Sequence, residues 1–237
     1  MNAEVTAFWR GRLQVWQPPR GGYRFGLDSV LLARFCPPAR SVCDLGAGCG
    51  IIGLLLLCAG KARQVSAIER QGELAELACR NAAGNGFAGR MRVIQADLRE
   101  QSLPRHDLVV FNPPYFRRGE GRSCGHPQRE AARREHWGTL HDFAARAVAS
   151  LTSRGLVATV VRPDRGGELI EHLGALGLTP RLLRPVAPRA GTLPRALMML
   201  FGRASGPCRR LSAWSLHPAS GPWRFAAGLR GWIERGA

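Results

Sequence analysis

The sequence predicts an α/β fold with about seven strands in one mostly parallel sheet and a short hairpin at the N-terminus. Two observations carry this prediction. Short apolar runs, of the length typical of buried strands, alternate along the chain with longer segments of helical periodicity, as in parallel sheets that helices cover on both faces. The 237 residues are 45% hydrophobic, which is enough for one large core and excludes disorder over most of the chain.

The N-terminal segment predicts the hairpin. Residues 11–28 alternate loosely between apolar and polar side chains around a turn at residues 17–22. This pattern predicts two short strands joined by that turn, followed by a helix that begins at Asp28 or Ser29.

Beyond residue 40, strands and helices follow each other in turn. The expected strands are Ser41–Leu45, Val65–Ile68, Met91–Ile94, Leu108–Phe111, Leu156–Val161, Arg181–Pro185 and Arg195–Phe201. The expected helices are Ile51–Ala59, Gly72–Ala83, Thr139–Leu151 and a segment after Asp164. Since no repeat or low-complexity linker divides the chain, we expect a hairpin and helix over residues 1–40, one main domain over residues 41–205, and a basic tail of unknown role over residues 206–237.

The charge balance indicates a partner that carries phosphate. The chain has 34 Lys and Arg against 17 Asp and Glu, a net charge of +17, and such an excess attracts polyanions. Lys61 is the only lysine. GC-rich codon usage, which favours arginine, is therefore an alternative source of the positive excess. However, no acidic residue lies between Glu171 and Glu234, which uniform codon bias would not produce. We therefore expect an RNA partner.

Other classes of protein are disfavoured. Seven cysteines show no C-x-x-C pair and no histidine at ligand spacing, so neither a disulfide framework nor a metal site is expected. No apolar run is long enough to span a membrane, and the first ten residues do not resemble a signal peptide. We therefore expect a cytoplasmic protein without a membrane partner.

A glycine-rich turn follows the first strand of the main domain. Gly46, Gly48 and Gly50 follow Asp44 there, and glycines at a strand-to-helix turn let the backbone approach a bound ligand closely. A plain tight turn is the alternative. Dinucleotide sites usually space these glycines G-x-G-x-x-G, so that a pyrophosphate rests on the helix N-terminus. The spacing here is G-x-G-x-G, and Asp44 would repel a pyrophosphate but would suit an ammonium group.

Two further acids lie at the ends of the next strands. Glu69 ends the second strand, where a carboxylate can bind both hydroxyls of a ribose. Asp97 follows the third strand, where it can bind the amino group of an adenine. With the glycine turn, these acids predict a Rossmann-like nucleoside site for S-adenosylmethionine rather than NAD.

The sequence Asn112-Pro113-Pro114-Tyr115 follows the fourth strand. Consecutive prolines stiffen the turn and remove backbone donors, so that carbonyl acceptors remain. If the Asn112 oxygen and the Pro113 carbonyl each accept a hydrogen of a conjugated amino group, its nitrogen lone pair is directed at a methyl donor. Tyr115 would stack on the flat substrate. An ordinary proline turn is the alternative.

These motifs, in this order, resemble the class I S-adenosylmethionine-dependent methyltransferases that act on amino groups. That branch includes enzymes for adenine N6, cytosine N4, guanine N2 and protein glutamine N5. The segments 22–32, 132–135 and 184–191 are similar to the bacterial tRNA1(Val) adenine N6-methyltransferase family over residues 10–205. The resemblance implies the class I methyltransferase fold and methylation of the adenine beside the anticodon of valine tRNA. Leu27 and Cys49 depart from that family's pattern, and the tail has no counterpart.

Six residues are candidates for substrate binding. The segments of the resemblance contain Arg24, Asp28, Arg133 and Arg189, whereas Arg117 and Arg118 follow the proline turn in an arginine-rich loop. Arginine can pair with phosphates and stack on unpaired bases, although a solvated loop is the alternative. The tail tryptophans, Trp214, Trp223 and Trp232, either stack on RNA bases or pack back on the domain.

Three other functions remain open. A ribosomal RNA adenine N6 or guanine N2 methyltransferase differs from the first hypothesis only in its substrate. A protein glutamine N5-methyltransferase would use the same chemistry, but those enzymes usually carry a helical domain before the core, and about 40 residues precede Ser41 here. A non-catalytic RNA-binding protein would not need Asn112.

Overall fold

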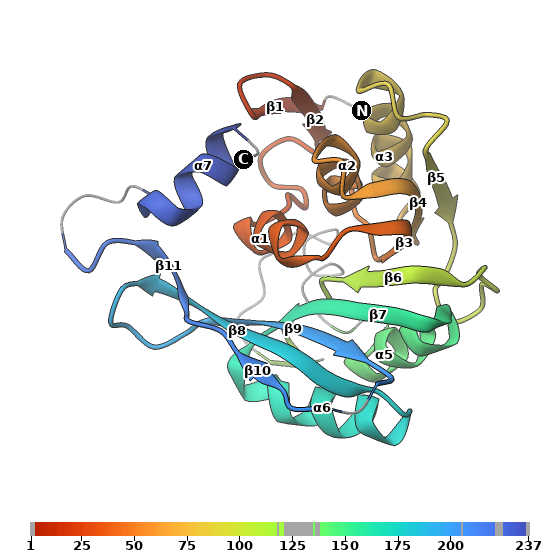
Figure 1. Cartoon of the computed structure of the whole chain (residues 1–237). Helices are drawn as coiled ribbons and strands as arrows, with labels where there is room; N and C mark the ends of the chain where they lie inside the picture. Colours follow the sequence, from red (N-terminus) through yellow and green to blue (C-terminus); the bar gives the residue numbers. More distant parts are fainter. Residues whose placement is uncertain are drawn as a thin grey trace.

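A computed structural model describes residues 3–117, 119–120, 135, 138–204, 206–220 and 225–235. The seven expected strands form one sheet in the order β8-β9-β7-β6-β3-β4-β5 (Figure 1). Their bounds are β3 (Ala39–Leu45), β4 (Ala62–Glu69), β5 (Met91–Gln95), β6 (His106–Phe111), β7 (Leu151–Val161), β8 (Thr179–Arg189) and β9 (Ala196–Gly202). All neighbours pair in parallel except β9, which is antiparallel to both β7 and β8. This confirms the predicted mostly parallel sheet.

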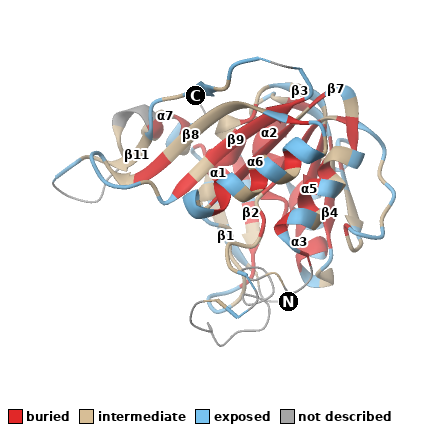
Figure 2. Ribbon diagram, turned by 90° about the horizontal axis from the view of Figure 1, so that it is seen from below, coloured by how far each residue is buried: buried red, intermediate tan, exposed pale blue. Residues whose placement is uncertain are grey.

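Helices cover both faces of the sheet (Figure 1). One face carries α1 (Leu27–Phe35), α2 (Ile51–Cys58) and α3 (Gly72–Gly84), and the other carries α5 (Leu140–Ala149) and α6 (Gly166–Ala175), which follows a short 3-10 turn, η1 (Pro163–Arg165). Figure 2 shows the strands buried between helices whose outer faces are exposed. A capping box begins α5, because the Thr139 hydroxyl accepts from the Asp142 N–H and the Asp142 carboxylate accepts from the Thr139 N–H.

The N-terminal hairpin exists, but its predicted position was wrong. Its strands are β1 (Glu4–Phe8) and β2 (Leu13–Gln17), and the turn between them has left-handed φ angles of 50°, 56° and 84° at Trp9, Arg10 and Gly11. The second strand is fixed by α3: the Asn81 and Asn85 side chains each bond both the N–H and the C=O of one β2 residue, at 2.6–2.9 Å. After β2, an isolated bridge between Arg20 and Gly22 stands where the predicted turn ends, and no second predicted strand follows in the described residues before α1.

The tail extends the sheet and returns to the N-terminus. Two short strands, β10 (Arg209–Arg210) and β11 (Trp214–His217), pair with β8 in parallel. The last helix, α7 (Ala227–Arg235), packs beside the hairpin and α1 (Figure 1). The Trp232 ring lies 5.0 Å from that of Trp9, and its Nε1 donates to the Val30 carbonyl at 3.3 Å.

Two of the three tail tryptophans therefore pack on the domain. Trp214 lies between two guanidinium groups, 5.1 Å from Arg34 and 4.7 Å from Arg184. Trp223 lies outside the described residues. None of the helices in the described part of the chain is long and apolar enough to cross a membrane.

Candidate active site

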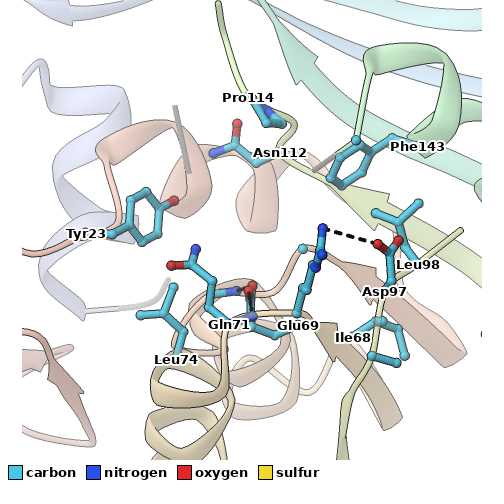
Figure 3. A pocket seen from close by; sticks show the side chains of 15 residues that line it. Tyr23, Ile68, Glu69, Gln71, Leu74, Asp97, Leu98, Asn112, Pro114 and Phe143 are labelled. Carbon is cyan, nitrogen blue, oxygen red and sulfur yellow. Dashed lines mark hydrogen bonds and ion pairs between the residues drawn. The ribbon is translucent and has the colours of Figure 1, made fainter. Parts of the chain in front are cut away.

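A cavity opens at the edge of the sheet where the parallel strands end (Figure 3). We call it the inner cavity. Its lining comes from the segment before α1, from the ends of β3, β4, β5 and β6, and from the starts of α3 and α5: Tyr23, Gly46, Gly48, Ile68, Glu69, Arg70, Gln71, Leu74, Ala96, Asp97, Leu98, Asn112, Pro114, Gly138 and Phe143. Four regions predicted from the sequence, the glycine turn, Glu69, Asp97 and the proline turn, thus meet around one space.

The three glycines of the turn have two different functions. Gly46 and Gly48 line the inner cavity with φ angles of 70° and 58°. A Cβ on Gly48 would lie 3.2 Å from the Tyr23 ring, so these positions leave the wall open where a side chain would narrow it. Gly50 does not line the cavity. It precedes α2, and a Cβ there would lie 2.6 Å from the Met91 methyl, so this glycine allows α2 to pack closely against its neighbours.

Glu69 holds two loops of the cavity together. Its carboxylate is 6% exposed and accepts hydrogen bonds from the Gly48 N–H and the Gln71 N–H, both at 2.8 Å. Burial raises the pKa of Glu69, and the backbone donors oppose that rise. Since a carboxylate offers about four lone-pair sites, both oxygens can still accept from a ligand in the cavity.

Asp97 lines the same cavity from the loop after β5. Arg99 binds its carboxylate through Nε and one terminal nitrogen, at 3.0 and 2.7 Å, and Arg70 approaches to 3.3 Å. The hydrogen bond from Arg99 is the main reason that the pKa of Asp97 is lowered to about 2. This carboxylate is therefore ionised throughout the physiological range and is held in one orientation.

Asp44 lies behind the cavity wall and does not line the cavity. It is fully buried in the centre of the sheet, where one carboxylate oxygen accepts from the Gly53 N–H at 3.3 Å. The other oxygen has no partner among the described residues. Burial raises the pKa of Asp44 to about 7, the Gly53 hydrogen bond lowers it, and the nearby Glu69 raises it further.

Asn112 lies between the inner cavity and a second one. This turn cavity is lined by Tyr23, Arg24, Gly26, Asp28, Asn112, Pro113, Tyr115 and Phe116, so Tyr23 and Asn112 border both spaces. The Asn112 amide nitrogen donates to the Ser29 hydroxyl of α1 at 3.0 Å. Within the described part of the chain, its amide oxygen has no hydrogen-bond donor, so the oxygen is left as an acceptor.

Tyr115 is joined to α1 through its hydroxyl. That hydroxyl donates to the Asp28 carboxylate at 2.6 Å. Burial raises the pKa of Asp28, and the hydrogen bond from Tyr115 opposes that rise, while burial raises the pKa of Tyr115 itself. Asp28 and Ser29, neighbours on α1, therefore hold the two ends of the proline turn.

The predicted substrate arginines do not form one group. Arg24 lines the turn cavity and pairs with Glu4 at 2.7 Å. Arg117 turns away to Glu168 at 2.8 Å, and Arg189 donates to the Pro218 carbonyl at 3.0 Å. Arg118 and Arg133 lie outside the described residues.

Sequence reasoning missed several residues of the site. Ser29 and Tyr23 lie in the segment 22–32 that carried the resemblance, but no pattern in the sequence assigns their side chains a role. Phe143 and Leu98 add apolar walls to the inner cavity, and they read as ordinary core residues. No signal marked Arg165, which is buried and binds Glu135 at 2.6 Å and Glu168 at 2.8 Å beneath the turn.

The inner cavity fits S-adenosylmethionine. Glu69 is placed to accept from ribose hydroxyls, and the fixed Asp97 to accept from an adenine amino group. Ile68, Leu98 and Phe143 offer apolar faces for the base. The wall is open at Gly46 and Gly48, and the unpartnered oxygen of Asp44 lies beneath it, where an ammonium or its bound water would supply a donor. The described residues contain no cluster of acidic, histidine and cysteine side chains suited to a metal ion.

Comparison with known proteins agrees with this geometry. The family model for the methyltransferase small domain matches residues 27–170. A tRNA1(Val) (adenine(37)-N6)-methyltransferase of Cronobacter sakazakii is 34% identical over 200 residues, 80% of this chain and 79% of that protein. The enzyme of that name from Klebsiella pneumoniae is 33% identical over 198 residues, with the same shares covered.

Solved structures confirm the class I methyltransferase fold. A predicted O-methyltransferase of Agrobacterium tumefaciens matches with a TM-score of 0.66 and 24% identity, over 86% of this chain and 94% of that one. The chain belongs to the methyltransferase small domain family, and within it to the group of the tRNA1(Val) adenine N6-methyltransferases.

Proposed function

We propose that this protein transfers a methyl group from S-adenosylmethionine to N6 of the adenine beside the anticodon of valine tRNA, in the cytoplasm. The observation that carries the proposal is the place of Asn112. Its side chain borders both the inner cavity and the turn cavity, and its amide is anchored by Ser29 so that the oxygen remains an acceptor. The names of the curated relatives supply the substrate.

The chemistry needs positioning more than a base. Bound S-adenosylmethionine supplies an electrophilic methyl group on a sulfonium. Asn112 Oδ1 and the Pro113 carbonyl each accept one hydrogen of the adenine amino group, which draws the nitrogen lone pair out of conjugation. The nitrogen forms the new bond to carbon, the carbon–sulfur bond breaks, and one amino proton leaves to water.

The two tyrosines act as neutral walls. Burial raises the pKa values of Tyr23 and Tyr115, so neither carries a negative charge that would compete for the sulfonium at neutral pH. Tyr115 offers a ring face for the base, while its hydrogen bond to Asp28 fixes the plane of that face.

Methyl transfer to defined tRNA transcripts tests the proposal. Purified enzyme with labelled cofactor should methylate a valine tRNA transcript, and digestion should yield N6-methyladenosine. A transcript with purine riboside at the target, which lacks the amino group, should accept no methyl. Methyl transfer to ribosomal RNA or to a release-factor peptide, with none to tRNA, would instead support a ribosomal RNA methyltransferase or a protein glutamine N5-methyltransferase. Absence of any transfer would favour a non-catalytic RNA-binding protein.

A further inference from the structure

An open groove leads outward from the turn cavity over the ends of β7, β8 and β11. We call it the edge groove, and its lining includes Phe116, Arg162, Val186, Pro188, Arg195 and Leu216. Asp28, Tyr115 and Phe116 line both the turn cavity and the edge groove. The two spaces are therefore continuous at the proline turn, where the target base must lie.

The walls of the edge groove are largely flat and apolar. Val186 is buried, while Phe116 and Pro188 are partly exposed toward the groove. The Arg162 guanidinium stacks over the Phe116 ring, 5.3 Å from its centre, so the groove wall offers a planar cation and a ring on which a base can stack. Such surfaces bind unstacked nucleobases without regard to sequence.

The charges of the edge groove favour an anion. Both acids in its lining are already engaged, since Asp164 pairs with Arg162 at 2.7 Å and Asp28 accepts from Tyr115 at 2.6 Å. Arg195 lines the groove as an exposed residue, and in the described part of the chain its guanidinium has no hydrogen-bond or ion-pair partner. A phosphate beside an apolar wall would complete this arrangement.

We propose that the edge groove binds the nucleotide next to the target adenine, with its base against Phe116 and Pro188 and its phosphate on Arg195. The inference rests on the proposed function, because it requires an RNA strand whose target base enters the turn cavity. Enzymes that act on an extruded base also contact the nucleotides that flank it. The groove is the continuous space in which that neighbour is received.

A matched pair of arginine variants tests the assignment. Arg195 and Arg203 precede and follow β9, so they are exposed arginines at opposite ends of one strand. The anticodon stem-loop of valine tRNA is the substrate. With it, R195A should raise KM about tenfold and leave kcat nearly unchanged. The slope of log binding constant against log salt concentration should fall by the amount that about one lost phosphate contact gives. R203A should leave KM within about twofold of the unchanged enzyme, because its side chain is remote from the groove.

Photochemical crosslinking locates the neighbouring nucleotide directly. A stem-loop with 4-thiouridine on either side of the target adenine should crosslink to peptides that contain Phe116 or residues 186–195 or 214–217. Crosslinks confined to other segments would overturn the assignment, as would R195A kinetics equal to those of R203A in an active enzyme. If the protein is a dimer and R195A dissociates it, the groove binds a second copy of the chain, and the assignment to a nucleotide is overturned. If the unchanged enzyme methylates neither the stem-loop nor whole tRNA, the proposed function itself fails, and the inference fails with it.

Discussion

At the scale of single residues, the site depends on groups that position Asn112 and Tyr115. Ser29 accepts a hydrogen bond from the Asn112 amide, and Asp28 accepts one from the Tyr115 hydroxyl. The motif Asn-Pro-Pro-Tyr predicted the acceptors, but it did not reveal what orients them. Asp28 was a candidate for substrate binding, and Ser29 read as an ordinary helix-start residue; the packing of α1 against the turn shows that both residues orient its side chains.

Removing the Ser29 hydroxyl tests the orientation of the amide. S29A should lower kcat about tenfold, since one hydrogen bond of about 1 kcal/mol fixes the amide and its loss lets the oxygen turn away. Cofactor affinity should stay unchanged. Ser41 provides the control, because its hydroxyl also makes a partly buried hydrogen bond, to Asp107 at 3.0 Å. Equal kcat values for S29A and S41A would contradict the positioning role.

Asp44 links the cofactor site to stability. Burial raises its folded-state pKa to about 7, above the ordinary value of a carboxylate in the unfolded chain. The folded state therefore holds the proton more tightly, and this group's contribution to stability falls as pH rises toward 7. D44N should show a stability advantage over the unchanged protein that grows by about 2 kcal/mol between pH 5.5 and 8.5.

Urea unfolding at the two pH values measures that difference, and cofactor titration completes the test. D44N should bind S-adenosylmethionine at least about tenfold more weakly at pH 8, because the amide lacks the negative charge that would attract the cofactor's ammonium from behind the glycine wall. Parallel stability curves for the two proteins would show that Asp44 does not titrate in this range.

At the scale of elements, the strands and helices of the main domain were predicted in place, whereas the hairpin was predicted but at the wrong residues. The central strands β3, β6, β7 and β9 contain apolar runs that are buried in the sheet, so composition and length located them. The hairpin depends on a left-handed turn at Trp9 and Arg10, residues that rarely adopt that conformation. It depends also on hydrogen bonds from the side chains of Asn81 and Asn85, which lie far along the chain. No local sequence pattern indicates these hydrogen bonds.

The helix α1 is held at its C-terminal end and near its middle by distant elements. The ammonium of Lys61, the only lysine, donates to the carbonyls of Ala33, Arg34 and Cys36 at 2.6–3.2 Å, at the C-terminal end of α1. Trp232 of the tail binds Val30 near its middle. The tail therefore supports the helix that positions the catalytic turn.

Shortening Trp232 tests this support. W232A should lower the free energy of unfolding by about 3–5 kcal/mol, the usual cost of removing a buried tryptophan, and should also lower kcat, since α1 carries Asp28 and Ser29. W214A is the control, because Trp214 is partly exposed and lies between arginines, where about 1 kcal/mol is expected. Urea unfolding of both variants gives the comparison. Similar small losses for the two would show that the tail does not brace α1.

At the scale of the whole molecule, the charge excess has two functions. Two arginines of β8 hold the tail, since Arg184 and Arg189 donate to the Ser212 and Pro218 carbonyls at 3.0 Å. Arg181 donates to the Ala204 carbonyl, just before the tail, at 2.8 Å. The net charge in the sequence indicated a polyanionic partner, but it could not separate arginines that bind RNA from arginines that bind the chain's own backbone.

The order of motifs predicted the site better than the charge did. The ends of parallel strands meet at one edge of a sheet, so the positions of the glycine turn, Glu69, Asp97 and Asn112 in the sequence implied one cavity. Asp44 was expected at that cavity, and the structure places it behind the wall. The difference between lining and supporting a site depends on side-chain packing, which spacing along the chain does not encode.

The central claim is that Asn112 presents an adenine amino group of tRNA to the methyl donor, and one comparison tests it most directly. N112A and the unchanged enzyme are assayed for N6-methyladenosine formed in a valine tRNA transcript, with cofactor affinity measured alongside. N112A should lose at least about a hundredfold in kcat, because a preorganised acceptor is removed, while cofactor affinity stays within a few fold. Full activity in N112A would contradict the account.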